Sequence, residues 1–175
     1  MMLPGRRLLL LAAAALLAGC GSGEESSGSD RPDPDAGPAA QVSAEYEAAQ
    51  EQYGLEFPDD VELPVLADRI ESLVEAESGE VSFEEGYGES ELLVVWRCAW
   101  ERSLLDALTS DDAPAADRAF AMLDRTYDLE LAKKYLDDPG RAWDEIVLGP
   151  ARAGDTGPLA EDLVNSCGPP FADVP

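Results

Sequence analysis

The stretch from Glu89 to about Thr109 constrains the fold most, because apolar side chains surround most of the helix it would form. These side chains are Leu92, Leu93, Val94, Val95, Trp96, Cys98, Ala99, Trp100, Leu104, Leu105 and Leu108. A helix that is apolar on nearly every face must be covered by other elements. We therefore expect a mainly α fold, a single small helical domain around this buried central helix. Because Val94 and Val95 are β-branched, a strand remains the alternative prediction for the first part of the stretch.

Amphipathic segments and stop signals alternate along the rest of the chain. Apolar residues recur with helical spacing at 42–53, 66–74, 116–127, 129–136, 143–147 and 159–164. Asp138 is expected to cap the helix at 143–147 with Pro139 at its first position, and Gly149 is expected to end it. The segment "LEFPDDVELP", at 55–64, contains two prolines and is expected to be extended.

The N-terminal residues have the pattern of an export signal. Arg6 and Arg7 precede an apolar run at 8–18, which is too short to span a hydrocarbon core of about 30 Å as a helix. The run ends in "LAGC", which resembles the lipobox of bacterial lipoproteins. This resemblance implies cleavage before Cys20, attachment of diacylglycerol and palmitate, and anchoring on the extracytoplasmic face of the cell membrane. An ordinary cleaved signal peptide and, for "RRLLL", the twin-arginine export route are the alternatives.

With Cys20 assigned to lipid, two cysteines remain, Cys98 and Cys167. Two remaining cysteines of an exported chain usually oxidise to one another. A bridge across their separation of 69 residues stabilises a fold by on the order of 4 kcal/mol. The alternative is a reactive thiol at Cys98, which needs a base or a cation nearby to lower its pKa. Because the chain contains no histidine, we predict the disulfide, which would join the last helix to the central one.

The sequence divides into three parts. The first is a signal peptide at 1–19, which is removed. The second is a lipid-anchored flexible linker at 20–41, whose composition cannot bury enough apolar surface to order the chain. Within it "DPDAG" has a passing likeness to a calcium loop but lacks the closing glutamate of an EF-hand, so we interpret it as solvated linker. The third part is the helical domain at 42–175.

Acidic residues outnumber basic ones by 37 to 12, which gives a net charge of −25. Without Arg6 and Arg7 ten basic residues remain, and the net charge of the mature chain is −27 (10 − 37). This charge argues against binding to nucleic acid, which depends on neutralising phosphates, and against docking onto anionic lipid headgroups. We expect a monomer that the lipid on Cys20 alone holds at the membrane. Its acidity serves solubility or, alternatively, a cationic protein, an envelope partner or divalent ions.

Motifs for catalysis are absent from the sequence. Without histidine there is no Ser-His-Asp or Cys-His system and no nitrogen-rich zinc site, and neither G-x-S-x-G nor a phosphate loop occurs. We therefore expect no cofactor and no metal, and we assign no catalytic residue. Carboxylate chemistry remains open, since a glycosidase needs only two carboxyl groups across a cleft. The first candidates are Glu84, Glu85, Glu89 and Glu91, beside Phe83 and Tyr87. A solvated acidic loop is the alternative interpretation of these glutamates.

Three segments of the domain, "YGLEFPDDVELP", "EEGYGESELLVVWRCAWE" and "NSCGPP", resemble small surface lipoproteins of high-GC Gram-positive bacteria with a W-x-C-x-W helix and a late cysteine. The resemblance implies the compartment, the disulfide and a mostly helical fold, but no activity. We expect a surface-exposed binding or interaction module. A carboxylate-dependent hydrolase acting on an extracellular or cell-wall glycan is the alternative. A deep cleft with two facing carboxylates of raised pKa would favour the hydrolase.

We expect the protein to fractionate with membranes and to incorporate a fatty-acid analogue during metabolic labelling. The Cys20→Ala variant should lose the label and be released or misprocessed, because it lacks the thiol that accepts diacylglycerol. The neighbouring Ser22→Ala variant serves as the control and should keep the label. Label retained on Cys20→Ala would overturn the lipidation site.

Overall fold

The computed structural model describes residues 37–76 and 81–172, and Cys20, the signal peptide and most of the linker lie outside them. The expected mainly helical fold is confirmed, since this part of the chain contains helices and no strand. The elements are α1 (Pro38–Tyr53), α2 (Leu66–Ala76), α3 (Tyr87–Thr109), α4 (Ala113–Leu123), η1 (Thr126–Asp128), α5 (Glu130–Tyr135), η2 (Asp144–Leu148), α6 (Gly149–Arg152), α7 (Gly157–Asp162) and η3 (Leu163–Cys167). Of the short elements, η1 is a 3₁₀-helix, and η2 and η3 are π-helical turns.

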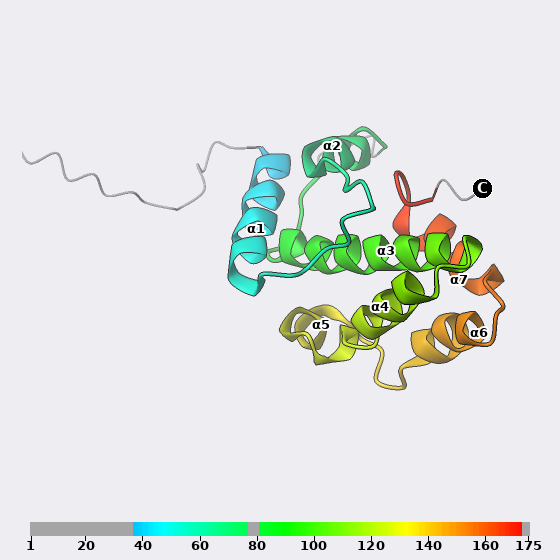
Figure 1. The fold of residues 1–175 in the computed structure, drawn as a ribbon. Helices are drawn as coiled ribbons and strands as arrows, with labels where there is room; N and C mark the ends of the chain where they lie inside the picture. The colour runs from blue at the N-terminus through cyan, green and yellow to red at the C-terminus, as the bar shows by residue number, and fades with distance from the viewer. Residues whose placement is uncertain (1–36, 77–80, 173–175) are drawn as a thin grey trace, which may run out of the picture. The chain divides into compact units, whose positions relative to one another are not determined.

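The predicted central helix, α3, crosses the middle of the domain. Figure 1 shows α2 on one side of it, α4, α5 and α6 on the other, and α1 across its beginning. Trp96 and Trp100 are each only 1% exposed. The strand considered for the first part of this stretch is wrong, because α3 is helical from Tyr87 onward. Val95 is buried within the helix, and packing on all sides outweighs the modest β preference of a branched side chain.

The extended segment between α1 and α2 is held in place by the two tryptophans of α3. The indole nitrogens of Trp96 and Trp100 both donate to the carbonyl oxygen of Glu56, at 2.8 and 2.9 Å. Buried indole N–H groups require an acceptor, so the W-x-C-x-W pattern also determines where this segment lies. As predicted, no helix forms between α1 and α2.

α1 crosses the start of α3 at close range because Gly88 has no side chain. A Cβ atom at Gly88 would lie 2.3 Å from the carbonyl oxygen of Val42 and 2.7 Å from the backbone nitrogen of Tyr46. The carboxylate of Glu45 accepts hydrogen bonds from the N–H groups of Gly86 and Gly88, at 3.1 and 3.0 Å. These are N–H groups that a helix leaves unpaired at its N-terminus, where negative charge is also favourable.

The predicted disulfide is confirmed and joins Cys98 of α3 to Cys167 of η3. Both residues are buried, at 0% and 1% exposure. The alternative of a reactive thiol at Cys98 is therefore wrong. The guanidinium of Arg69 in α2 donates from Nη1 to the carbonyl oxygen of Cys167 at 2.8 Å. The end of the chain is thus attached to α3 by a covalent bond and to α2 by a hydrogen bond.

The helix boundaries near the C-terminus differ from those expected. Asp138 acts as a cap, since it accepts from the N–H groups of Ala142 and Trp143 at 2.8 and 3.1 Å, but Pro139 lies in the turn before the helix. The predicted end at Gly149 is wrong, because η2 continues directly into α6. The N–H of Gly149 bonds to the carbonyl of Asp144 across the π-turn, and the proline that follows occupies the first turn of α6, where its missing N–H costs little.

Two apolar residues of the π-turns lie outside the core. Ile146 in η2 and Val164 in η3 were expected on buried faces, but they are 64% and 55% exposed. Their neighbours Val147 and Leu163 are buried instead, and adjacent side chains of a helix point in different directions. At the other end of the domain, α1 begins at Pro38 rather than Val42, since proline fits the first turn of a helix.

Replacing Gly88 with alanine should destabilise the fold, because the new methyl group would overlap the backbone of α1. We expect the free energy of unfolding to fall by about 1–3 kcal/mol, the usual cost of overpacking, in denaturant titrations followed by circular dichroism. Gly140→Ala is the control, since a Cβ there meets nothing within 4 Å. If Gly88→Ala lowers the free energy of unfolding no more than Gly140→Ala does, α1 does not pack against Gly88.

Candidate functional site

A groove of about 650 Å³ lies between the start of α2, with the segment before it, and the C-terminal end of the chain. One wall consists of Glu62, Leu63, Pro64, Val65, Asp68 and Arg69, and the other of Val164, Asn165, Ser166, Cys167, Gly168, Pro169 and Pro170. Its volume is within the range of sites that bind small molecules or short segments. The residues of the two walls are about a hundred positions apart in the sequence, so only the fold brings them together.

Exposed aliphatic side chains border this groove on both sides. Val65 on one wall is 64% exposed, and Val164 on the other is 55% exposed. Ile146, which is also exposed, does not line the groove. Scattered single apolar residues on a surface need no explanation, but a paired set across a concave surface is typical of a binding site.

The charged side chains that line the groove differ in whether they can pair with a ligand. Glu62 is exposed at the rim. The guanidinium of Arg69 forms an ion pair with the buried Glu91 through Nε, and Nη1 donates to the carbonyl of Cys167. The positive charge of Arg69 is therefore balanced inside the protein, and the rim of the groove is acidic.

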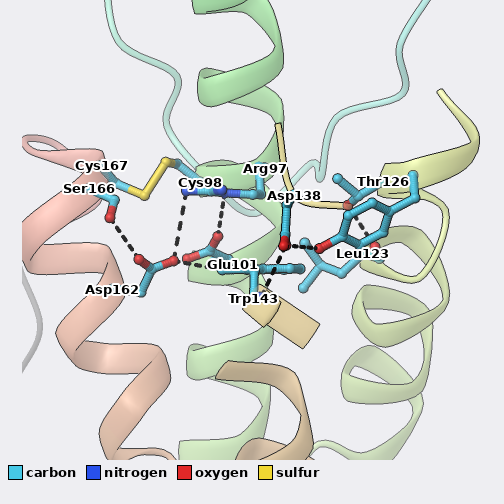
Figure 2. A network of polar contacts seen from close by, with 11 residues as sticks. Arg97, Cys98, Glu101, Leu123, Thr126, Asp138, Trp143, Asp162, Ser166 and Cys167 are labelled. Carbon is cyan, nitrogen blue, oxygen red and sulfur yellow. Dashed lines mark hydrogen bonds and ion pairs between the residues drawn. A yellow bond between two sulfur atoms is a disulfide. The ribbon is translucent and has the colours of Figure 1, made fainter. Parts of the chain in front are cut away.

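An ion cluster, buried at Glu101 and partly buried at Arg97 and Asp162, supports the C-terminal wall of the groove (Figure 2). Nε of Arg97 lies 2.9 Å from Oε1 of Glu101, one turn along α3, and Nη2 of Arg97 lies 3.8 Å from Oδ2 of Asp162 in α7. Asp162 also accepts from Nε1 of Trp143 at 2.8 Å and from Oγ of Ser166 at 2.7 Å. Because Ser166 lines the groove, this network connects its wall to the central helix.

The carboxyl group of Glu101 is the one in this cluster that is completely buried. It lies against the guanidinium of Arg97 and the carboxyl group of Asp162. Burial raises the pKa of Glu101 well above its usual value, the positive charge of Arg97 partly opposes this rise, and the nearby Asp162 adds to it. The fold therefore favours the protonated, neutral form of Glu101.

Glu101 and Asp162 are two neighbouring carboxyl groups, but they do not face a cleft. Glu101 is 0% exposed, and neither residue lines the groove. A glycosidase needs its two carboxyl groups on either side of a bound sugar. This geometry gives the hydrolase alternative no support.

Of the four glutamates that the sequence suggested, only Glu85 and Glu89 lie together, in a shallow pocket of about 450 Å³ that Lys134 and Tyr135 also line. Glu84 and Glu91 are not among the residues that line it. Glu91 is buried and pairs with Arg69 of α2. Glu89 accepts a hydrogen bond from Nζ of Lys134 at 2.8 Å, and this bond lowers the pKa of Glu89. Glu84 and Glu85 are exposed at the turn before α3. The lowered pKa of Glu89 keeps its carboxylate ionised, whereas an acid catalyst needs a raised pKa, so this pocket does not show the pair of carboxyl groups expected of a hydrolase.

Within residues 37–76 and 81–172, no cluster of three or more His, Cys, Asp or Glu side chains is arranged to hold a metal ion. None of the helices in these ranges combines the length and the hydropathy needed to cross a membrane. Comparisons of the chain with protein families, with curated proteins and with solved structures found no match.

Sequence reasoning did not single out the groove or the buried cluster. A signal for the cluster was present, since Arg97 and Glu101 are charged residues one turn apart in an otherwise apolar stretch. Asp162 had no comparable signal among so many acidic residues. The groove had none, because Val65 and Val164 are unremarkable in sequence and become informative only through their exposure.

Glu101→Gln tests the protonation state of the buried carboxyl group. A carboxyl group whose pKa is raised by folding contributes stability below its unfolded pKa of about 4.3, and this stability is lost as the pH rises through the folded pKa. Glutamine stays neutral throughout. We therefore expect the stability of the variant, relative to the unmodified protein, to rise between about pH 5 and pH 8 by on the order of 1 kcal/mol.

Denaturant titrations across this pH range measure the difference in the free energy of unfolding. Glu161→Gln, at an exposed position of α7, is the control and should show a difference that does not change with pH. A Glu101→Gln variant that becomes less stable than the unmodified protein as the pH rises would mean that Glu101 is ionised and is stabilised by Arg97.

Proposed function

We propose that the protein is a lipid-anchored binding module on the extracytoplasmic face of the cell membrane, and that its partner occupies the groove between 62–69 and 164–170. The observation that carries this proposal is the exposure of Val65 and Val164 on opposite walls of one groove. Covering such side chains is favourable by about 25 cal/mol for each Å² of apolar surface removed from water. A bound partner would remove this exposed surface on both walls at once.

The firm attachment of the C-terminal wall also supports a binding role. Cys167 is bonded to Cys98 and accepts a hydrogen bond from Arg69, and Ser166 donates to Asp162. These contacts connect the wall to α2, α3 and α7. A site whose walls are already in place loses less conformational entropy on binding, which leaves more of the contact energy for affinity.

The anchor is proposed from "LAGC" and Cys20, which lie outside the described residues. A flexible linker from Cys20 to the start of α1 at Pro38 would hold the domain roughly 25 Å from the membrane, by the usual scaling of chain length. The strong negative charge of the domain would keep it away from anionic headgroups. The groove would then be free to meet a partner in the extracytoplasmic space.

Site-specific photo-crosslinking in cells tests this function. A benzoylphenylalanine placed at Val65 or at Val164 should form an adduct of defined mass, because both positions would contact the bound partner. The same residue at Ile146, which is equally exposed but lies outside the groove, is the matched control and should give little adduct. Adducts of equal yield at all three positions, or none at Val65 and Val164, would contradict the proposal.

A further inference from the structure

The charge of the groove restricts the sign of its ligand. Glu62 is exposed at the rim, the charge of Arg69 is balanced by Glu91, and the whole chain carries a net charge of −25. An anionic ligand would be repelled by the rim and by the field of the domain, whereas a cationic one would be attracted. Charge complementarity therefore points to a basic ligand.

The walls of the groove restrict the apolar part of the ligand. Leu63, Pro64 and Val65 on one wall and Val164, Pro169 and Pro170 on the other provide aliphatic surface. No aromatic side chain is among the residues that line the groove in the described part of the chain. The site thus lacks the aromatic faces that bind quaternary ammonium ions, and its surface suits aliphatic groups. The long aliphatic stems of lysine and arginine suit it as well, because they cover apolar surface while their charged ends stay in water.

The backbone of the wall at 62–65 favours a peptide. Within the described ranges, the N–H groups of Glu62, Leu63 and Val65 form no hydrogen bond with another backbone group, and no helix includes these residues. An extended peptide that lies along such a segment pairs with its backbone groups. Alternate side chains of an extended peptide point to opposite sides, so aliphatic ones can enter the groove while basic ones reach the acidic rim.

On the basis of the proposed function, we propose that the occupant of the groove is a short extended segment of a partner protein in which aliphatic and basic residues alternate. The aliphatic residues lie between Val65 and Val164, and a basic residue pairs with Glu62. The groove volume of about 650 Å³ limits the contact to a short segment. The partner is therefore recognised through its local sequence and its charge.

Fluorescence anisotropy with labelled synthetic peptides and the purified full-length protein tests this inference. A peptide in which valine alternates with lysine should bind. A peptide with glutamate in place of lysine, and one with serine in place of valine, should each bind at least about tenfold more weakly. If the peptide with serine in place of valine binds as tightly as the valine and lysine peptide, the interaction depends on charge alone and the aliphatic part of the inference is wrong. If the peptide with glutamate in place of lysine binds more tightly than the valine and lysine peptide, the groove prefers an anionic ligand and the inference of a basic one is wrong.

Variants locate the peptide on the surface. Val164→Asp, Val65→Asp and Glu62→Lys should each weaken binding of the valine and lysine peptide by about fivefold or more. The matched controls are Ile146→Asp, for an exposed apolar residue outside the groove, and Glu161→Lys, for an exposed acidic one. Circular dichroism identifies any variant that does not fold. Equal losses in the groove variants and the controls would overturn the inference, because binding would then be adsorption to the acidic surface.

The outcome separates this inference from the proposed function. If adducts form at Val65 and Val164 in cells but the valine and lysine peptide does not bind, the groove remains the binding site and the ligand class is wrong. If neither result is obtained, both proposals fail. Peptide binding that the groove variants weaken, together with adducts at both positions, supports the two proposals jointly.

Discussion

The disulfide between Cys98 and Cys167 is the constraint on which the rest of this structure depends. It closes a separation of 69 residues, and a loop of this size stabilises a fold by on the order of 4 kcal/mol, a large share of a typical net stability of about 5–15 kcal/mol. It also has a local consequence. Because Cys167 is fixed to the central helix, the residues on either side of it, Ser166 and Gly168, form one wall of the groove. The same bond therefore stabilises the domain and shapes its candidate binding site.

The buried cluster around Arg97 makes a different contribution. Burial of a carboxyl group is costly, and Glu101 is fully buried between the guanidinium of Arg97 and the carboxyl group of Asp162. The fold accommodates it by favouring its neutral form, as the raised pKa indicates. The carboxylate of Asp162 has its own hydrogen-bond donors, since Trp143 and Ser166 both donate to it. Its contacts determine how α7 and η3 lie against α3, and thus hold the wall behind Val164.

The groove has an acidic rim and exposed aliphatic side chains. Together these two features restrict the class of ligand that we expect it to bind. A net charge of −25 explains solubility by itself, but it does not explain why Val65 and Val164 are exposed together. An aliphatic groove without charge would bind many apolar partners. In the interaction that we propose, the acidic rim adds discrimination, because it would repel anionic partners and attract basic ones. Glu62 is the residue of this rim on which we expect discrimination to depend.

The sequence by itself determined the central helix, the disulfide and the extended segment, because each follows from local rules. A helix that is apolar on all faces must be buried. Cys98 and Cys167 are the two cysteines that remain once Cys20 is assigned to lipid. Two prolines exclude a helix at 55–64. Tertiary structure decided the rest. Ile146 and Val164 are exposed beside the buried Val147 and Leu163, and packing rather than local pattern decides which of two adjacent apolar residues faces the core. The groove and the protonation of Glu101 depend on residues distant in sequence, and burial and proximity between such residues exist only once the chain has folded.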